Sequence, residues 1–165
     1  MPRSMPVLIA TALLGAFVWG PLPTTQAAGL GTAVTANDPL YLPVTARARI
    51  GGVTIGLEVA DEQAEQIRGL MFRPPLADRR GMLFPFTPAQ PVSFWMFNVP
   101  VSLDMVFIHN GRVRGVVTAP PCAATPCPVY GLGPRPVDAV IELRAGHAAE
   151  LGIAVGQRVR ITPRR

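Results

Sequence analysis

The sequence predicts a mainly β fold, at the margin of α+β: a compact barrel-like or sandwich-like domain of about seven or eight short strands with one short helix. Three observations predict this class. Short runs of apolar, aromatic and β-branched residues recur along the chain, with Pro, Gly or Asn between them. Two of these breaks, Gly51-Gly52 and Asn110-Gly111, are typical hairpin turns. A single segment has the spacing of an amphipathic helix.

Residues 1–27 have the layout of a secretory signal peptide and are not expected to join the fold. Arg3 precedes an apolar stretch from Val7 to Trp19, about 13 residues long and short of the roughly 20 that a membrane-spanning helix needs. Small residues then lead to a cleavage site after Ala27; an uncleaved anchor is the alternative. We therefore expect a periplasmic or secreted protein with no transmembrane segment after cleavage.

The first part of the mature chain predicts a leader, a hairpin and the helix. Residues 28–43 are small and polar with scattered Pro, which predicts a flexible leader before a single mostly-β domain at 44–165. Strands from Arg47 to Ile50 and from Val53 to Val59 flank the Gly pair. A helix from Glu62 to Leu70 is expected to follow. Its inward face is formed by Ala64, Ile67 and Met71, its N-cap is Asp61, and Pro74-Pro75 ends it.

The remainder of the chain predicts strands that are covered on both faces or nearly so, because their apolar runs are almost continuous. A second hairpin is expected at Asn110-Gly111, and a helical turn at Gly146 to Leu151. The expected strands are Met82 to Phe86, Val92 to Phe97, Leu103 to Ile108, Val113 to Thr118, Val137 to Leu143 and Gln157 to Thr162.

Two cysteines, Cys122 and Cys127, stand close together in a Pro-rich segment. In an oxidising compartment such a pair predicts a disulfide that fixes one loop. A zinc site would need more Cys or His ligands nearby, and a redox-active pair would have two intervening residues rather than four. No metal and no cofactor are expected.

The net charge is +5, and all fifteen basic residues are Arg. Four of them, Arg158, Arg160, Arg164 and Arg165, lie in the last eight residues. No aromatic residues alternate with these arginines, as a stacking surface for nucleic acid would require, and the signal peptide leads away from DNA. We expect a solvated terminal strand and no nucleic-acid partner; attraction to anionic lipid or polymer is an unspecific alternative.

Several ordered motifs resemble the bacterial and archaeal domain-of-unknown-function family 192 over roughly Val53 to Ile161. The motifs are Arg68-Gly69-Leu70-Met71-Phe72-Arg73, Arg80-Gly81-Met82-Leu83-Phe84, Phe94-Trp95-Met96 with Asn98, Pro100, Leu103-Asp104, Tyr130, Ile141-Glu142-Leu143 with Gly146, and Leu151-Gly152. The resemblance implies a compact mostly-β domain, often exported, and no established reaction. Where the family usually has Trp-Met-Lys-Asn-Thr, this chain has Phe97 and Val99, so a basic group and a hydroxyl are missing.

The candidate site centres on Asp104, the one acid in the apolar run Val92 to Ile108. Removing a carboxylate from water costs several kcal/mol unless a cation or hydrogen-bond donors meet it. Alternation predicts that Leu103, Met105 and Phe107 form the better-buried face, which excludes Asp104. One hypothesis is a pocket rim, and the other is a structural clamp or turn cap. The ligand-binding candidates are Asp104, Trp95, Asn98, Arg68, Arg73 and Arg80.

Two functions follow from this site. The first is a non-catalytic envelope module that binds a small ligand, a peptide or a partner protein at an Arg/Asp/Trp-lined pocket. The alternative is a hydrolase or lyase with Asp104 or Glu142 as general acid or base. His109 and His147 are expected to be solvated rather than catalytic. The methionines at 71, 82, 96 and 105 are expected to fill the core rather than bind copper(I).

Overall fold

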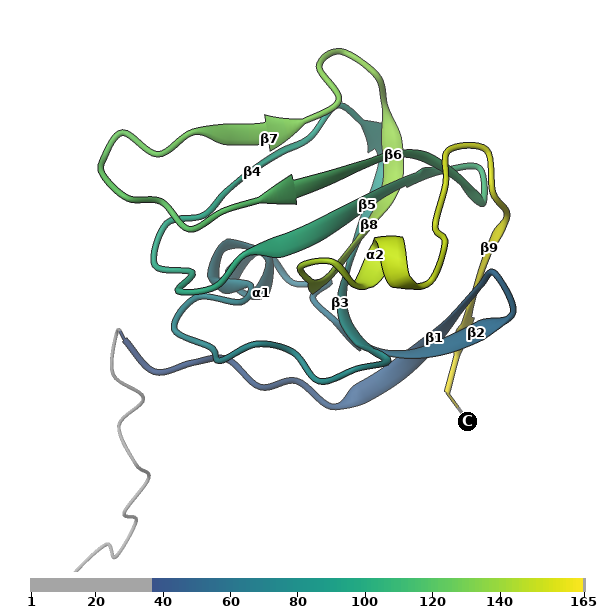
Figure 1. The fold of residues 1–165 in the computed structure, drawn as a ribbon, viewed down its shortest axis with the longest axis horizontal. Coiled ribbons are helices and arrows are strands. Elements are labelled where there is room, and N and C mark those ends of the chain that lie inside the picture. The colour runs from purple at the N-terminus through teal and green to yellow at the C-terminus, as the bar shows by residue number, and fades with distance from the viewer. Residues whose placement is uncertain (1–36, 165) are drawn as a thin grey trace, which may run out of the picture. The chain divides into compact units, whose positions relative to one another are not determined.

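The computed structural model describes residues 37–164, so the expected signal peptide and most of the expected leader lie outside the described residues. The described part is mainly β, as the sequence predicts (Figure 1). It has nine strands and two short helices, where the sequence predicts about seven or eight strands and one short helix. The elements are β1 (Val44–Ile50), β2 (Val53–Val59), α1 (Gln63–Arg68), β3 (Arg80–Gln90), β4 (Ser93–Trp95), β5 (Leu103–His109), β6 (Arg112–Ala119), β7 (Val129–Gly131), β8 (Val137–Arg144), α2 (His147–Glu150) and β9 (Val159–Pro163).

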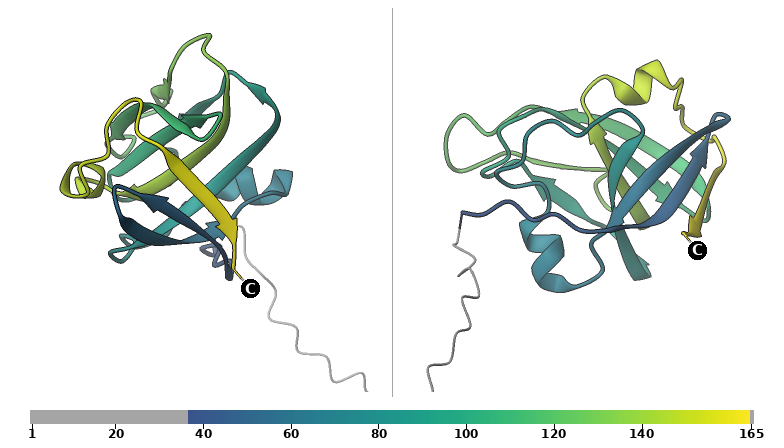
Figure 2. Two further views of the ribbon diagram at one scale, coloured as in Figure 1. Left: turned by 90° about the vertical axis from the view of Figure 1, so that its right-hand side faces the viewer. Right: turned by 90° about the horizontal axis from the view of Figure 1, so that it is seen from below.

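Seven strands form one sheet in the order β6-β5-β8-β3-β2-β1-β9, and β4 pairs with β7 in a separate two-stranded ribbon. All neighbours in the large sheet are antiparallel except β2 and β3, which run parallel. The sheet curls strongly, and the two helices lie on opposite sides of it (Figure 2). The curl follows from the right-handed twist that strands accumulate across a sheet.

Both expected hairpins are present because their turn residues adopt the required backbone. Gly51, Gly52, Asn110 and Gly111 all have positive φ, which Gly adopts freely and Asn tolerates better than most residues. The turns join β1 to β2 and β5 to β6 in register. Strand β7 was not expected, since three residues are too few to show a period of two.

Helix α1 ends earlier than the sequence predicts. It spans Gln63–Arg68 and stops at Gly69, which has a φ of 46°, rather than at the proline pair. The prediction that Asp61 is the N-cap is also wrong, because the N-cap is Glu62. The carboxylate of Glu65 accepts hydrogen bonds from the backbone N–H groups of Asp61 and Glu62, both at 3.2 Å. A glutamate that reaches back in this way satisfies amides left free at a helix start.

Two apolar layers lie on the two faces of the large sheet. The first, which we call the interior core, receives side chains from all seven of its strands and from Ala148 and Ile153, so the sheet curls around it. The second, which we call the outer layer, covers the opposite face of β3, β5 and β8. Loop residues complete it, among them Leu70, Met71 and Met96. The four methionines expected in the core all lie in this outer layer.

The end of the expected leader is fixed to the domain. The backbone N–H of Leu42 donates to Glu58 Oε2 at 3.0 Å, and the carbonyl of Leu40 accepts from Arg73 Nη1 at 3.1 Å. The Arg73 guanidinium lies 4.4 Å from the centre of the Tyr41 ring, a cation–π distance. The ordered domain therefore includes at least three residues before β1.

Candidate functional site

Asp104 is not at a pocket rim. Its side chain is buried, with the residue only 2% exposed, and both carboxylate oxygens have a partner. Oδ1 accepts from the Thr118 hydroxyl at 2.7 Å, and Oδ2 accepts from the backbone N–H of Ala148 at 2.9 Å. Asp104 therefore attaches the first turn of α2 to the sheet, where a helix terminus favours an anion.

The prediction that the face of Asp104 is the less buried one was wrong. Every residue from Leu103 to Ile108 is buried. Asp104, Val106 and Ile108 face the interior core, while Met105 faces the outer layer. Because β5 is covered on both faces, alternation along it cannot distinguish an exposed side.

Arg73 has an acidic partner other than Asp104. Its Nη1 and Nη2 donate to the two carboxylate oxygens of Glu58 at 2.6 and 3.0 Å, and both side chains are buried. A bidentate pair of this kind is strong once desolvated, and removing one member leaves an uncompensated buried charge. The expected clamp between an arginine and Asp104 is therefore absent from the described residues. A buried clamp joins Arg73 to Glu58 instead, connects β2 to the segment after α1, and holds the leader through Tyr41.

The other two candidate arginines lie apart from Asp104. The Arg68 guanidinium lies 5.3 Å from the centre of the Phe72 ring. Arg80 begins β3 and is exposed. The structure thus does not bring the six candidates together at one mouth.

Glu142 is the second acid of an apolar strand, and it is 4% exposed. It pairs in register with Met82 on one side and Met105 on the other, so it lies in the outer layer between two thioether side chains. Within residues 37–164, its carboxylate has no hydrogen-bond partner. Burial without a partner raises the pKa of Glu142 to about 8, so the protonated form dominates at neutral pH.

Asp104 and Glu142 cannot act as a catalytic carboxylate pair. Met105 is the register partner of Glu142, and Leu143 is that of Asp104. Register partners share a face and successive residues alternate, so the two acids point to opposite faces of the sheet. The paired-carboxylate version of the enzyme hypothesis is therefore excluded.

A polar cluster that the sequence did not predict surrounds α2. Arg144 donates to Asp78 at 2.5 Å and to Glu150 at 3.0 and 2.5 Å, and Glu150 Oε2 also lies 2.9 Å from His147 Nδ1. The hydrogen bond with Arg144, and to a smaller extent the one with His147, lowers the pKa of Glu150 to about 2. The hydrogen bonds that Arg144 donates to Glu150 and Asp78 raise the pKa of Arg144. His147 was expected to be solvated but is buried, and its Nε2 accepts from the Arg79 N–H at 3.3 Å. The cluster fastens α2 and shows no free nucleophile.

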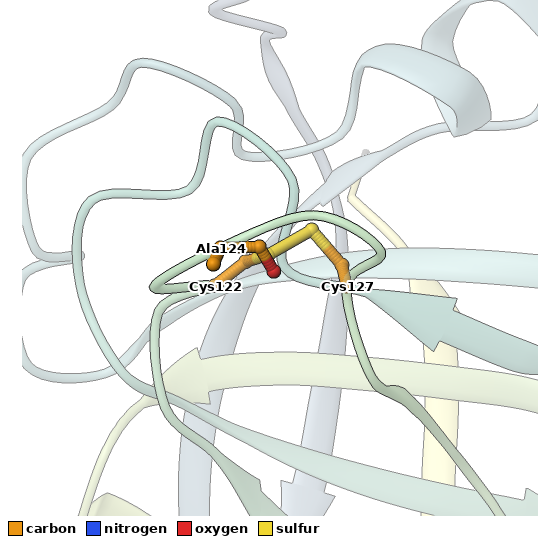
Figure 3. Close-up of a disulfide and its surroundings, with 3 residues drawn as sticks. All are labelled: Cys122, Ala124 and Cys127. Atoms are coloured by element: carbon orange, nitrogen blue, oxygen red, sulfur yellow. A yellow bond between two sulfur atoms is a disulfide. The ribbon is translucent and has the colours of Figure 1, made fainter.

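The Cys122–Cys127 disulfide forms as expected and closes a loop between β6 and β7 (Figure 3). The carbonyl oxygen of Ala124 lies inside this loop, 3.3 Å from Cys122 Sγ. The loop forms one wall of an open hollow of about 620 Å³. The hollow is lined by Phe72, Met96, Phe97, Asn98, Val99, Pro100, Pro121, Cys122, Ala123, Ala124 and Thr125, none of which carries a charge.

Asn98 shapes the opposite wall. It has a φ of 57°, and its carbonyl accepts from the Phe72 N–H at 2.8 Å, while Val99 N–H donates to the Met96 carbonyl at 3.2 Å. Asn tolerates the left-handed conformation that this turn requires. The Asn98 side chain is exposed beside the hollow, so it is available to a ligand.

A second hollow, of about 390 Å³, lies next to Trp95. It is lined by Gln63, Gln66, Ile67, Phe84, Phe86, Gln90, Pro91, Val92, Ser93, Phe94 and Trp95, again without a charged residue. The Trp95 ring stacks on the Phe97 ring at 5.1 Å between centroids, with 28° between the planes. Trp95 lines one hollow and Phe97 lines the other, so the stacked pair stands between them.

Comparisons with known proteins identify the family. The profile of DUF192, described as an uncharacterized ACR, matches residues 46–161. The chain belongs to this family. It is similar to a crystal structure described as that of a putative transcription regulator from Sinorhizobium meliloti 1021, with 32% identity, 73% of this chain and 96% of that chain covered, and a TM-score of 0.64. It is also similar to the crystal structure of a protein of unknown function from Novosphingobium aromaticivorans DSM 12444, with 33% identity and a TM-score of 0.60. That match covers 80% of this chain and 99% of the other chain.

No curated protein matches this DUF192 chain. Within residues 37–164, no helix is long and apolar enough to cross a bilayer. The same part of the chain contains no group of three His, Cys, Asp or Glu side chains that could hold a metal ion. In this DUF192 domain, Phe97 stacks on Trp95, and none of the residues that line the two hollows carries a charge.

Proposed function

We propose that this domain is a non-catalytic binding module of the cell envelope, and that its ligand is an extended apolar peptide segment of an exported partner. One observation supports the proposal above the others. Two uncharged hollows lie on either side of the stacked Trp95–Phe97 pair, and the Trp95 residue is 51% exposed. An exposed indole is costly in water and is often a binding hot spot.

The shape and chemistry of the hollows favour a peptide over a small molecule. Both hollows are open, and together they extend past the aromatic pair rather than enclosing one compact ligand. Aromatic-lined grooves are a recurring way to bind extended peptides that contain proline. The amide groups of Gln63, Gln90 and Asn98 lie along the hollows and could hydrogen-bond a peptide backbone, whereas a charged ligand would find no opposite charge there.

The walls are held before any ligand arrives. The disulfide closes the loop on one side, and the Asn98 turn is tied to Phe72 on the other. Gln66 Nε2 donates to the carbonyls of Ala60 and Pro85, both at 3.2 Å, which fixes α1 beside the second hollow. A preformed site spends less conformational entropy on binding.

The second candidate is a hydrolase or lyase with Glu142 as its general acid. The raised pKa of Glu142 favours it, because a carboxyl group that is protonated at neutral pH can donate a proton. Asp104 does not support it, since both of its oxygens are occupied in the interior core. Neither hollow beside the aromatic pair is lined by Glu142, so the peptide-binding proposal is the better supported.

The envelope location rests on the expected signal peptide. The Sinorhizobium meliloti relative is described as a transcription regulator. An exported chain would not meet DNA, so we do not extend that description to this protein.

The test is a screen of immobilised peptides against the parent and three variants. We expect apolar, proline-containing peptides to bind the parent, and Trp95→Ala or Phe97→Ala to weaken binding about 30-fold, the scale of a 2 kcal/mol hot spot. Val155→Ala is the matched control, because Val155 is 70% exposed and lines neither hollow. Equal binding by all variants would refute the site. Turnover of a peptide, glycan or ester that Glu142→Gln abolishes would select the enzyme instead.

A further inference from the structure

A second surface, distant from the hollows, carries a concentration of positive charge. Five exposed arginines lie on the solvent face of β9, β1, β2 and β3 or just before β9, and we call this surface the arginine face. Its members are Arg47, Arg49, Arg80, Arg158 and Arg160. Strands β1, β2 and β9 lie at the other end of the domain from the β4–β7 ribbon (Figure 1).

The strand register brings these arginines together. Arg49 pairs directly with Arg160 across β1 and β9. Arg47 pairs with Gly56, and Gly56 pairs with Arg80 across the parallel strands. Because Gly56 has no side chain, Arg80 Nη1 can lie over it, 3.6 Å from where a Cβ would stand. Arg49 and Arg160 thus lie on neighbouring strands, whose backbones are about 4.8 Å apart, whereas Arg47 and Arg80 lie two strands apart with Gly56 between them.

Arg158 extends the face at the hairpin end. Together with Arg49 and Arg160 it lines a hollow of about 290 Å³, whose remaining lining residues are Gly51 and Gly52. A neighbouring hollow of about 450 Å³ is lined by Arg158 and Arg160 as well, and it contains one acid, Asp138. That acid already accepts from the Asn110 N–H at 2.7 Å.

Within residues 37–164, none of the five guanidinium groups has a hydrogen bond or an ion pair. The nearest acid along β2 is Glu58, which is held by Arg73. Like charges directly across a strand pair destabilise a sheet, so the Arg49–Arg160 pair is unfavourable unless an anion lies between them. The face therefore gathers positive charge that no acidic side chain of the described residues neutralises.

We propose that the arginine face binds the phosphate groups of an anionic lipid surface. Guanidinium groups match phosphate oxygens in a bidentate manner and remain charged at every physiological pH. Each arginine near such a surface strengthens attachment by about a fivefold factor. The contact leaves the hollows at the other end accessible to a peptide.

Lipid phosphate fits the surface better than nucleic acid does. Strands β1, β2 and β9 carry no aromatic side chain, and the two phenylalanines of β3, Phe84 and Phe86, line the hollow beside Trp95 instead. Single-stranded nucleic acid, by contrast, is bound by stacking on aromatic rings. Within residues 37–164, no helix projects from this face to enter a DNA groove. Unpaired guanidinium groups gathered on one side of the sheet suit a plane of headgroups.

The test measures the fraction of the protein that sediments with lipid vesicles. The protein is purified from the envelope fraction of producing cells. We expect the parent to sediment with vesicles that contain about one third phosphatidylglycerol, and Arg49→Gln/Arg160→Gln to bind about 30-fold more weakly. Arg114→Gln/Arg135→Gln is the matched control, because it removes the same charge from exposed positions outside the face. Circular dichroism melting should show that both double variants fold.

Three results would overturn the proposal. Equal losses in the two double variants would show that only net charge matters. Calorimetric binding of inorganic phosphate or pyrophosphate to the parent, without vesicle binding, would assign the face to a soluble anion. Tighter binding to duplex DNA than to the vesicles at equal salt would assign it to nucleic acid.

Discussion

Asp104 in the interior core and Glu142 in the outer layer are buried carboxylates on neighbouring strands of the same sheet, and the two differ in their partners. Asp104 in the interior core accepts hydrogen bonds at both oxygens. Glu142 in the outer layer stands between methionines, and its pKa is raised to about 8. The difference teaches that burial alone does not decide the state of an acid; the donors within reach decide it.

The source of the donors explains the difference. The interior core is closed by α2, whose first turn provides the Ala148 N–H. The outer layer is closed by loops that contribute Leu70, Met71 and Met96, and such side chains offer no donor. Glu58 shows that a carboxylate of the outer face can be satisfied when Arg73 reaches it.

The largest expected effect comes from Glu142. Its folded-state pKa of about 8 exceeds the unfolded value of 4.5, so the folded state binds the proton more tightly and stability falls as pH rises from about 4.5 to 8. We expect the free energy of unfolding of the parent to fall by about 4 kcal/mol between pH 5 and pH 9. Glu142→Gln, which cannot ionise, should lose far less, as measured by urea denaturation at several pH values.

Met82→Leu is the control for this measurement. It changes packing beside Glu142 without removing a titrating group, so it should keep the pH dependence of the parent. Parallel curves for the parent and Glu142→Gln would mean that the carboxylate is solvated in the folded protein, and the contrast with Asp104 would disappear.

The next largest effect is expected at Asp104, whose two carboxylate oxygens both accept hydrogen bonds. Asp104→Ala leaves the buried Ala148 N–H without an acceptor and should lower the free energy of unfolding by about 3 kcal/mol at neutral pH. Thr118→Val removes the second donor alone and should lower it by about 1 kcal/mol. Chemical denaturation measures both. A loss below about 0.5 kcal/mol for Asp104→Ala would contradict a role in holding α2.

A smaller effect than that of Asp104→Ala is expected at the edge of the outer layer. Replacing both Cys122 and Cys127 by Ala should lower the free energy of unfolding by about 2 kcal/mol, the value for so short a loop. Peptide binding to the hollows should weaken as well, because the loop forms one of their walls. Thermal melting and the peptide screen test the two parts separately; unchanged binding would show that the loop does not need the disulfide.

The fold could be predicted further than the site. Hairpins depend on adjacent residues, so Gly51-Gly52 and Asn110-Gly111 located them correctly. The sequence indicated that Asp104 and Arg73 need partners but not which ones. The partner of Asp104 that joins it to α2 is the backbone amide of Ala148, 44 positions away, and backbone amides carry no sequence signal. The partner of Arg73, Glu58, was detectable as an acid in the apolar strand from Val53 to Val59.

The parallel pairing of β2 with β3 has a consequence for the order of folding. Parallel neighbours cannot be joined by a tight turn, so the chain must first travel back along the sheet through α1 and the segment that carries Arg73. Closing such a long connection costs entropy before any native contact compensates for it. The antiparallel hairpins should therefore form early, and the covering of the outer layer, with the two hollows beside Trp95 and Phe97, should be among the last parts to consolidate.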